Sequence, residues 1–141
     1  MLEIENFNSS KTNISFSLKI TNVSNDSIMT YLPKKNDICL QLFKVRFIDL
    51  ENMDEHELAP CKWYADLDHI KLNGKNTLSL KPNGFYCQKY DFVKKDISPK
   101  IKTEKQYKFY VKWLFKDVDF VGDTTSLCRD NVISNSISFT N

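Results

Sequence analysis

The chain has 141 residues, a formal net charge of +2 and 41% hydrophobic residues, a composition that fits one globular domain with its own core. No stretch approaches the roughly 20 apolar residues of a membrane helix, so we expect no membrane insertion. Most of the cations are lysines, which together with the small net charge argues against nucleic acid as a partner.

Alternating apolar and polar residues in the first part of the chain predict strands with one buried face. Residues 1–12 are interpreted as an N-terminal tail and residues 13–141 as the folded domain. The segment from Ile14 to Ile20 alternates regularly and predicts the first strand. The polar run from Asn22 to Ser27 predicts a turn, so residues 28–32 would return as the second arm of a hairpin.

The next segment, residues 37–50, is the longest run with strand character. Its apolar phase changes near Leu42, which predicts a β-bulge at that point. Residues 51–60 are acidic and lack an apolar stripe, so we expect a loop or a single helical turn. Residues 61–64 predict a short strand.

Turn residues divide the following part of the chain. Asn73-Gly74 lies between the apolar segments 70–72 and 77–80 and predicts a tight turn. The sequence from Lys81 to Gly84 predicts a second turn, and residues 85–92 predict the strand that follows it.

The C-terminal part contains the most regular strand pattern. A polar connection over residues 94–105 leads into the segment from Tyr107 to Phe115, where aromatic and apolar residues alternate with polar ones. A loop over residues 117–130 precedes a closing strand over residues 133–139. The inward residues that we expect in the core include Phe16, Leu18, Val111, Trp113 and Ile137.

Seven or eight short strands, only three glycines and no helical period predict an all-β fold, a single antiparallel β-sandwich. Four segments together resemble bacterial immunoglobulin-like sandwich proteins, and this resemblance also implies a β-sandwich. These segments are Ile20–Ile28, Leu80–Gly84, Tyr107–Phe115 and Ser134–Phe139. The resemblance implies an immunoglobulin-like sandwich of seven to eight strands, although the Cys-Trp-Cys arrangement of true immunoglobulin domains is absent from the sequence.

That group of proteins includes accessory domains, intracellular proteinase inhibitors and immunity proteins that neutralise antibacterial toxins. The resemblance therefore implies a non-catalytic protein-binding domain. A single domain of this size favours an immunity protein that binds and neutralises a bacterial toxin or effector. The alternative is an accessory immunoglobulin-like module of a cell-surface or secretion protein, and the sequence leaves the oligomeric state open.

Residues with catalytic or metal-binding chemistry are few. His56 and His69 lie in no recognisable catalytic motif, and three glycines cannot build a phosphate-binding loop. The spacings that join each histidine to Cys61 do not match those of structural zinc sites. We therefore expect no catalytic residue, no cofactor and no metal, and we interpret both histidines as exposed loop residues.

Four cysteines, at positions 39, 61, 87 and 128, predict at least one disulfide in a small β-domain. They can pair in three ways, and the sequence does not choose among them. A disulfide favours a periplasmic or otherwise extracytoplasmic location. The native-looking Met1, with no visible signal peptide, favours the cytoplasm as the alternative. We expect the extracytoplasmic location.

Acidic residues are concentrated between Asp49 and His69, where seven carboxylates accompany one lysine. We expect these groups to be exposed and to bind a protein, such as a toxin or effector, with a basic surface. If they are an ordinary solvated surface instead, the lysine-bearing sheet faces are the next candidate. The predicted partner-binding residues are Asp49, Glu51, Asp54, Glu55, Glu57, Asp66 and Asp68.

Overall fold

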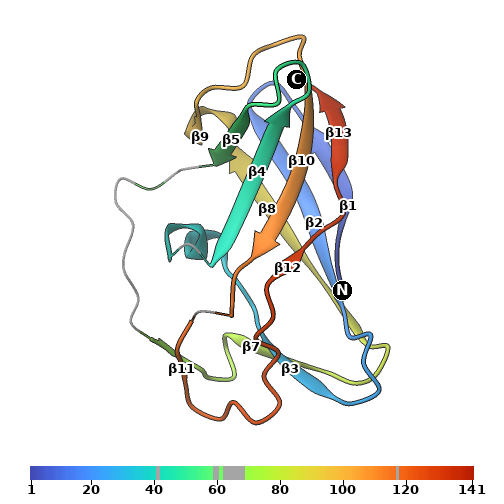
Figure 1. Cartoon of the computed structure of the whole chain (residues 1–141), viewed down its shortest axis with the longest axis vertical. Coiled ribbons are helices and arrows are strands. Elements are labelled where there is room, and N and C mark those ends of the chain that lie inside the picture. Colours follow the sequence, from blue (N-terminus) through green and yellow to red (C-terminus); the bar gives the residue numbers. More distant parts are fainter. Residues whose placement is uncertain (41, 59–60, 62–68, 117) are drawn as a thin grey trace.

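The computed structural model shows an all-β chain built mainly from antiparallel sheets (Figure 1). The helices in the described part of the chain are two short 3-10 segments, η1 (Lys35–Leu40) and η2 (Lys94–Asp96). No helix in this part is long and apolar enough to span a membrane. The structure describes residues 1–141 with the exception of residues 41, 59–60, 62–68 and 117.

Three strands form the smaller of two main sheets, in the spatial order β1-β2-β8. The central strand, β2, pairs antiparallel with both neighbours, and its ladder with β8 keeps a continuous register along the whole of β8. Because apolar and polar residues alternate, every second residue of β2 is buried. The three strands are β1 (Leu2–Ser9), β2 (Asn13–Thr21) and β8 (Phe85–Val93).

Six strands form the larger main sheet. Its path is β12-β10-β4-β5-β9, and β13 also pairs with β10. The β4–β10 ladder at its centre runs without interruption. The strands are β4 (Phe43–Asp49), β5 (Glu55–Leu58), β9 (Ile97–Ser98), β10 (Gln106–Trp113), β12 (Val132–Ile133) and β13 (Ile137–Thr140).

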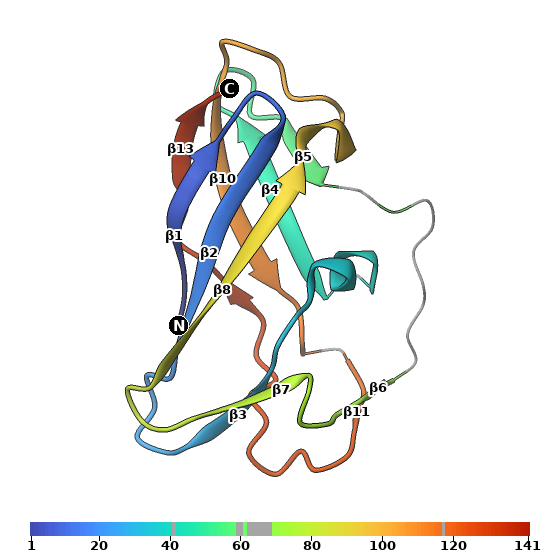
Figure 2. The same cartoon turned by 180° about the vertical axis from the view of Figure 1, so that it is seen from behind.

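Two further strand pairs lie together at one end of the molecule (Figure 2). β3 pairs antiparallel with β7, whereas β6 and β11 pair in parallel. The ring of Tyr31 on β3 lies 5.7 Å from that of Phe120 on β11, which packs the two pairs against each other. Their bounds are β3 (Ile28–Tyr31), β6 (Ile70–Lys71), β7 (Thr77–Leu80) and β11 (Phe120–Val121).

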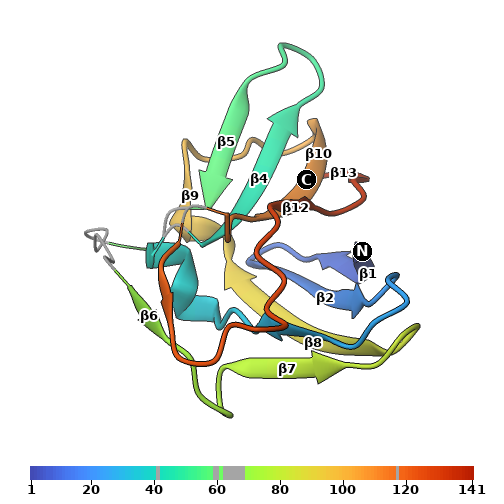
Figure 3. The ribbon, with the colours of Figure 1, turned by 60° about the horizontal axis from the view of Figure 1, so that its bottom comes forward.

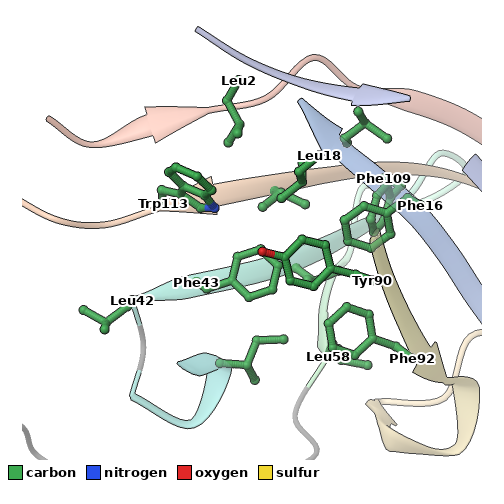
Figure 4. Close-up of a cluster of buried hydrophobic side chains, with 14 of the residues drawn as sticks. Leu2, Phe16, Leu18, Leu42, Phe43, Leu58, Tyr90, Phe92, Phe109 and Trp113 are labelled. Carbon is green, nitrogen blue, oxygen red and sulfur yellow. The ribbon is translucent and has the colours of Figure 1, made fainter. Parts of the chain in front are cut away.

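The two main sheets pack face to face, and the hydrophobic core lies between them (Figure 3). Figure 4 shows apolar side chains of both layers meeting there. The ring of Phe16 on β2 lies 4.9 Å from that of Phe109 on β10, and Phe43 on β4 lies 4.9 Å from Tyr90 on β8. Aromatic burial therefore joins one layer directly to the other.

The most regular sequence patterns predicted their strands correctly. The strands expected over residues 14–20, 85–92 and 107–115 are confirmed as β2, β8 and β10, while the closing strand is divided into β12 and β13. Ile137 is only partly buried. The other four named core residues are buried, as predicted: Phe16, Leu18, Val111 and Trp113.

Both predicted turns are also confirmed. The N–H of Asn76 donates to the carbonyl of Asn73 at 3.0 Å, and that of Gly84 donates to Lys81 at 2.8 Å. In the second turn Asn83 has a φ of 60°, a left-handed conformation that asparagine tolerates better than most residues. The two strands beside the first turn do not pair with each other, because β6 pairs with β11 and β7 with β3.

The interpretation of residues 1–12 as a tail is wrong for residues 2–9, which form β1 in the smaller sheet. Leu2 and Ile4 are buried in the core. The alternation that marks this strand is short, because the pairing register with β2 shifts after Glu5. The first half of β1 follows the period-two rule, but the bulge interrupts the alternation, so the sequence pattern did not predict the strand.

The hairpin predicted from residues 14–20 and 28–32 is wrong as well. The chain turns a corner after β2 and continues into β3, which pairs with β7. The buried side chain of Asn22 holds this corner, since its amide donates to the carbonyls of Asp26 at 2.7 Å and Leu80 at 3.1 Å. The polar run predicted the turn, but local sequence does not specify which strands pair.

Two predictions in the middle of the chain need correction. The single strand expected over residues 37–50 is divided into η1 and β4, so the phase change near Leu42 marks a helix-to-strand transition and not a bulge. Residues 55–58 form β5 instead of a loop or helical turn. His56 and Leu58 point inward, whereas Glu55 and Glu57 point outward. This period-two pattern is too short to predict a strand on its own.

Cys39 and Cys61 form a disulfide, which confirms the prediction of at least one. The bond joins η1 to the segment after β5, across a separation of 22 positions in the sequence. Cys87 and Cys128 are free thiols. The short strand predicted over residues 61–64 lies, beyond its first residue, outside the described residues.

Replacing Phe109 with alanine should destabilise the protein by about 3–5 kcal/mol, because its fully buried ring touches rings from both sheets. Phe85→Ala is the matched control. Phe85 is 63% exposed, so its loss should change the free energy of unfolding by less than about 0.5 kcal/mol. Urea denaturation followed by tryptophan fluorescence measures both variants, and equal effects would contradict the assigned core.

Replacing Cys39 and Cys61 together with serine should lower the free energy of unfolding by about 3 kcal/mol, the value expected for a closed loop of this length. Cys87→Ser is the control, because that exposed thiol constrains no loop. Reductant should lower the Tm of the wild type but leave that of the double-serine variant unchanged. A wild-type Tm that does not respond to reductant would argue against the bond.

Candidate functional site

The described residues of the predicted acidic site lie on the hairpin of β4 and β5. Two of its residues, Asp66 and Asp68, lie outside the described residues. The other five occupy three places: Asp49 at the end of β4, Glu51 and Asp54 in the turn, and Glu55 and Glu57 on β5.

Asp49 is buried, contrary to the expectation that it is exposed. Its carboxylate accepts the backbone N–H of Glu51 at 2.9 Å and lies 3.3 Å from the ammonium group of Lys105. The hydrogen bond from Glu51 is the main cause that lowers the pKa of Asp49, and Lys105 adds to it. These partners compensate the desolvation of the carboxylate. The Glu51 contact is local, whereas no local sequence pattern reveals Lys105, which is 56 positions away.

Lys105 neutralises much of the hairpin tip. Its ammonium group forms ion pairs with both Asp49 and Glu51. The hydrogen bond to Glu51 is the main cause that raises the pKa of Lys105 above its ordinary value. The side chain of Asp54 accepts a hydrogen bond from Asn52 within the same turn. The tip therefore offers a cationic partner less unpaired negative charge than the sequence suggested.

A second charge cluster lies on the outer face of the larger sheet. Arg46 on β4 lies between two carboxylates of β5, with its nitrogens 3.7 Å from Glu55 and 3.0 Å from Glu57. The hydroxyl of Tyr110 on β10 donates a hydrogen bond to Glu55. This hydrogen bond is the main cause that lowers the pKa of Glu55. Burial and the nearby Glu55 together raise the pKa of Tyr110 to about 12.

The lysines of β10 continue this surface, which faces the viewer in Figure 1. Lys108, Tyr110 and Lys112 alternate with buried residues along the strand. The ammonium group of Lys112 lies 5.4 Å from the centre of the Tyr110 ring, a cation–π contact. A shallow depression of about 350 Å³ is lined by Ile48, Lys108, Tyr110, Lys112, Ile133, Ser134 and Ser136.

The surface is net positive, because its four cations outnumber the carboxylates of Glu55 and Glu57. Ile133, which lines the depression, is 60% exposed. An aromatic ring and an exposed aliphatic side chain can supply apolar contact area here, with charged side chains around them as in the polar rim of an interface. We call this surface the basic sheet face and define it by Lys44, Arg46, Lys108, Tyr110 and Lys112.

The sequence contained only part of the signal for this face. The alternation of residues 107–115 placed Lys108 and Lys112 on the polar side of a strand, as the structure confirms. Their proximity to Arg46 and Ile133 depends on the pairing of β10 with β4 and β12, which are distant in the chain. Only the register of the sheet brings these residues together.

The interpretation of His56 as an exposed loop residue is wrong, because it lies on β5 and is buried. The edge of its ring faces Tyr107, with the ring centroids 5.8 Å apart. Neither ring nitrogen has a hydrogen-bond partner among the described residues. His69 is exposed, as expected.

In the part of the chain that the structure describes, no group of three or more His, Cys, Asp or Glu side chains could hold a metal ion. Comparison of the chain with protein-family models, curated proteins and solved structures finds no match. The function is therefore inferred from the geometry of the chain itself.

Replacing Tyr110 with phenylalanine should raise the pKa of Glu55, because the tyrosine hydroxyl is the main cause of its lowering. Since the folded pKa of Glu55 lies below its unfolded value, its contribution to stability is present at neutral pH and is lost as the pH falls through the folded pKa. NMR titration of the Glu55 carboxyl carbon measures the change. Tyr86→Phe should leave it unaltered, and an equal titration in both variants would contradict the contact.

Proposed function

We propose that this chain is a non-catalytic protein-binding domain that contacts its partner through the basic sheet face. The observation that carries the proposal is the clustering of Lys108, Tyr110, Lys112 and the exposed Ile133 around one depression. Tyrosine and aliphatic side chains supply contact area in interfaces, while the surrounding charges set orientation and association rate. The face stands on the uninterrupted β4–β10 ladder, which supports a pre-organised surface.

The partner that fits this face has an acidic surface. The net positive charge of the basic sheet face would attract such a partner and accelerate its association. The basic partner that the acidic stretch suggested is less well supported, because Lys105 and Arg46 already pair with four of its carboxylates. Charge pairing within the chain thus favours the opposite sign of partner.

The most specific form of the proposal is an immunity protein with an immunoglobulin-like sandwich fold that binds and neutralises a bacterial toxin or effector. Two antiparallel sheets packed face to face support the sandwich. An exposed sheet face with charged and aromatic residues supports binding through a preformed surface. An accessory module of a surface or secretion protein is the alternative use of the same fold.

We further propose a periplasmic or otherwise extracytoplasmic location. The disulfide between Cys39 and Cys61 supports it, because such bonds form and persist in oxidising compartments.

Co-expression tests the neutralising function. The product of the gene adjacent to that of this chain is expressed in a bacterial host, first alone and then together with the chain. We expect the neighbouring product to arrest growth and the chain to restore it. Growth arrest that persists in the presence of the chain would overturn the proposal. If the gene encodes a multidomain precursor that contains the chain, the accessory module is favoured.

Replacing Lys108 and Lys112 together with glutamate should weaken binding of the purified partner at least tenfold, mainly through slower association. Because the two reversals make the face net negative, higher ionic strength should no longer slow association, as it does for the wild type. Stopped-flow measurements at two ionic strengths test both effects. The matched control is the charge reversal of Lys75 and Lys81, two exposed lysines away from this face. An equal loss in both variants would remove the basic sheet face from the interface.

A third variant distinguishes the two possible signs of the partner. Replacing Asp54 with asparagine and Glu55 and Glu57 with glutamine makes the hairpin and the basic sheet face more positive. An acidic partner should then bind faster, whereas a basic partner should bind more slowly. Slower association of this variant would indicate that the acidic residues form the binding site.

A further inference from the structure

The edge of the smaller sheet at β8 is open in the part of the chain that the structure describes. β8 lies at the end of the order β1-β2-β8, and β2 is its one strand partner there. Figure 2 shows β8 on the side of the sheet away from β1. Its register with β2 is continuous over nine residues, without a bulge or a proline.

The backbone hydrogen bonds show which residues of β8 point outward. Asn22 N–H donates to the carbonyl of Gly84 at 2.9 Å, and Lys94 N–H donates to that of Thr12 at 2.8 Å. Because hydrogen-bonded pairs alternate in an antiparallel ladder, the even-numbered residues of β8 bond to β2. The odd-numbered residues direct their N–H and C=O groups to the open edge. These residues are Phe85, Cys87, Lys89, Asp91 and Val93.

The opposite edge of the same sheet is protected. The pairing of β1 is irregular after Glu5, and a bulge of this kind disfavours further strand addition. The side chain of Asn135 also bonds to both the N–H and the carbonyl of Ile4 on β1. Among the described residues, the outward N–H and C=O groups of β8 have no such partner. The contrast marks the β8 edge as one where another strand fits.

The charges on β8 identify the strand that fits. Lys89 and Asp91 are exposed on the outer face of the sheet, two residues apart. If a second β8 pairs antiparallel about Tyr90, each Lys89 lies directly opposite the Asp91 of the other copy. Centring the pair on Lys89 or on Asp91 instead places like charges opposite each other, which destabilises a strand pair. Charge therefore selects both the second copy and its register.

We propose that two copies of this chain associate through β8, antiparallel and centred on Tyr90, to form one continuous six-stranded sheet. Each outward residue then exchanges two backbone hydrogen bonds with the residue opposite it. Cys87 lies opposite the second copy's Val93. The proposal does not rest on the function proposed above, because the basic sheet face belongs to the other sheet and stays exposed in both copies.

Charge reversal with rescue tests the pairing. Lys89→Asp and Asp91→Lys should each weaken dimerisation at least tenfold in sedimentation velocity experiments, because each creates like-charge pairs. The double variant Lys89→Asp/Asp91→Lys restores opposite charges and should restore the dimer. Rescue also separates the pairing from the hydrogen bond that Asn13 donates to Asp91 at 2.9 Å, which the double variant lacks. Lys75→Asp, outside β8, is the control and should dimerise like the wild type.

A cysteine substitution tests the register. In a Cys128→Ser background, Val93→Cys should allow a disulfide to Cys87 of the second copy, since directly opposite hydrogen-bonded residues lie about 5.5 Å apart between Cα atoms. Oxidised glutathione accepts the two electrons and two protons of the thiols. Without that substitution the two Cys87 residues should not crosslink. Each lies opposite position 93 of the other copy, six residues from that copy's own Cys87, which is a distance of about 20 Å along the strand.

Several outcomes would overturn the proposal. The first is a wild-type chain that stays monomeric up to its solubility limit. The second is a dimer that Lys89→Asp does not weaken, and the third is equal crosslinking with and without Val93→Cys. Circular dichroism of every variant distinguishes lost association from lost folding.

Discussion

Four strands meet at one cluster of aromatic rings, on which the rest of the fold depends. Phe109 of β10 is fully buried and contacts Phe7 of β1, Phe16 of β2 and Phe47 of β4. Since these strands belong to two different sheets, the same cluster sets the spacing of the layers. It also fixes which side of β10 faces inward. The outward side, with its lysines and tyrosine, takes its position from this buried contact.

Sequence periodicity predicted the fold where strands are long and regular. β2, β8 and β10 follow the period-two rule over most of their length, and each was found. β1 was missed because a register shift interrupts its alternation, and β5 because four residues are too few to establish a period. The mistaken hairpin after β2 has a different cause. Strand pairing is a property of the whole chain, and Asn22 fixes that corner through a contact with Leu80.

The candidate site was harder to predict than the fold. The sequence showed an excess of carboxylates between positions 49 and 68, but a count of charges does not show how they pair. Lys105 neutralises the tip of the hairpin from a distant part of the chain, and Arg46 lies between Glu55 and Glu57 across a strand ladder. The basic sheet face arises from the same ladder. Its lysines were visible as the polar side of a strand, whereas their neighbours were not.

The alternation along β10 has a consequence for how the protein can change over evolution. Odd-numbered residues from Tyr107 to Trp113 are buried, and even-numbered residues point to solvent. Substitutions at odd positions therefore change the buried core, while those at even positions change the outer surface of the strand. Tyr110 is the exception, because its hydroxyl is tied to Glu55. Lys108 and Lys112 can therefore be exchanged for other polar residues during evolution while the aromatic core stays constant.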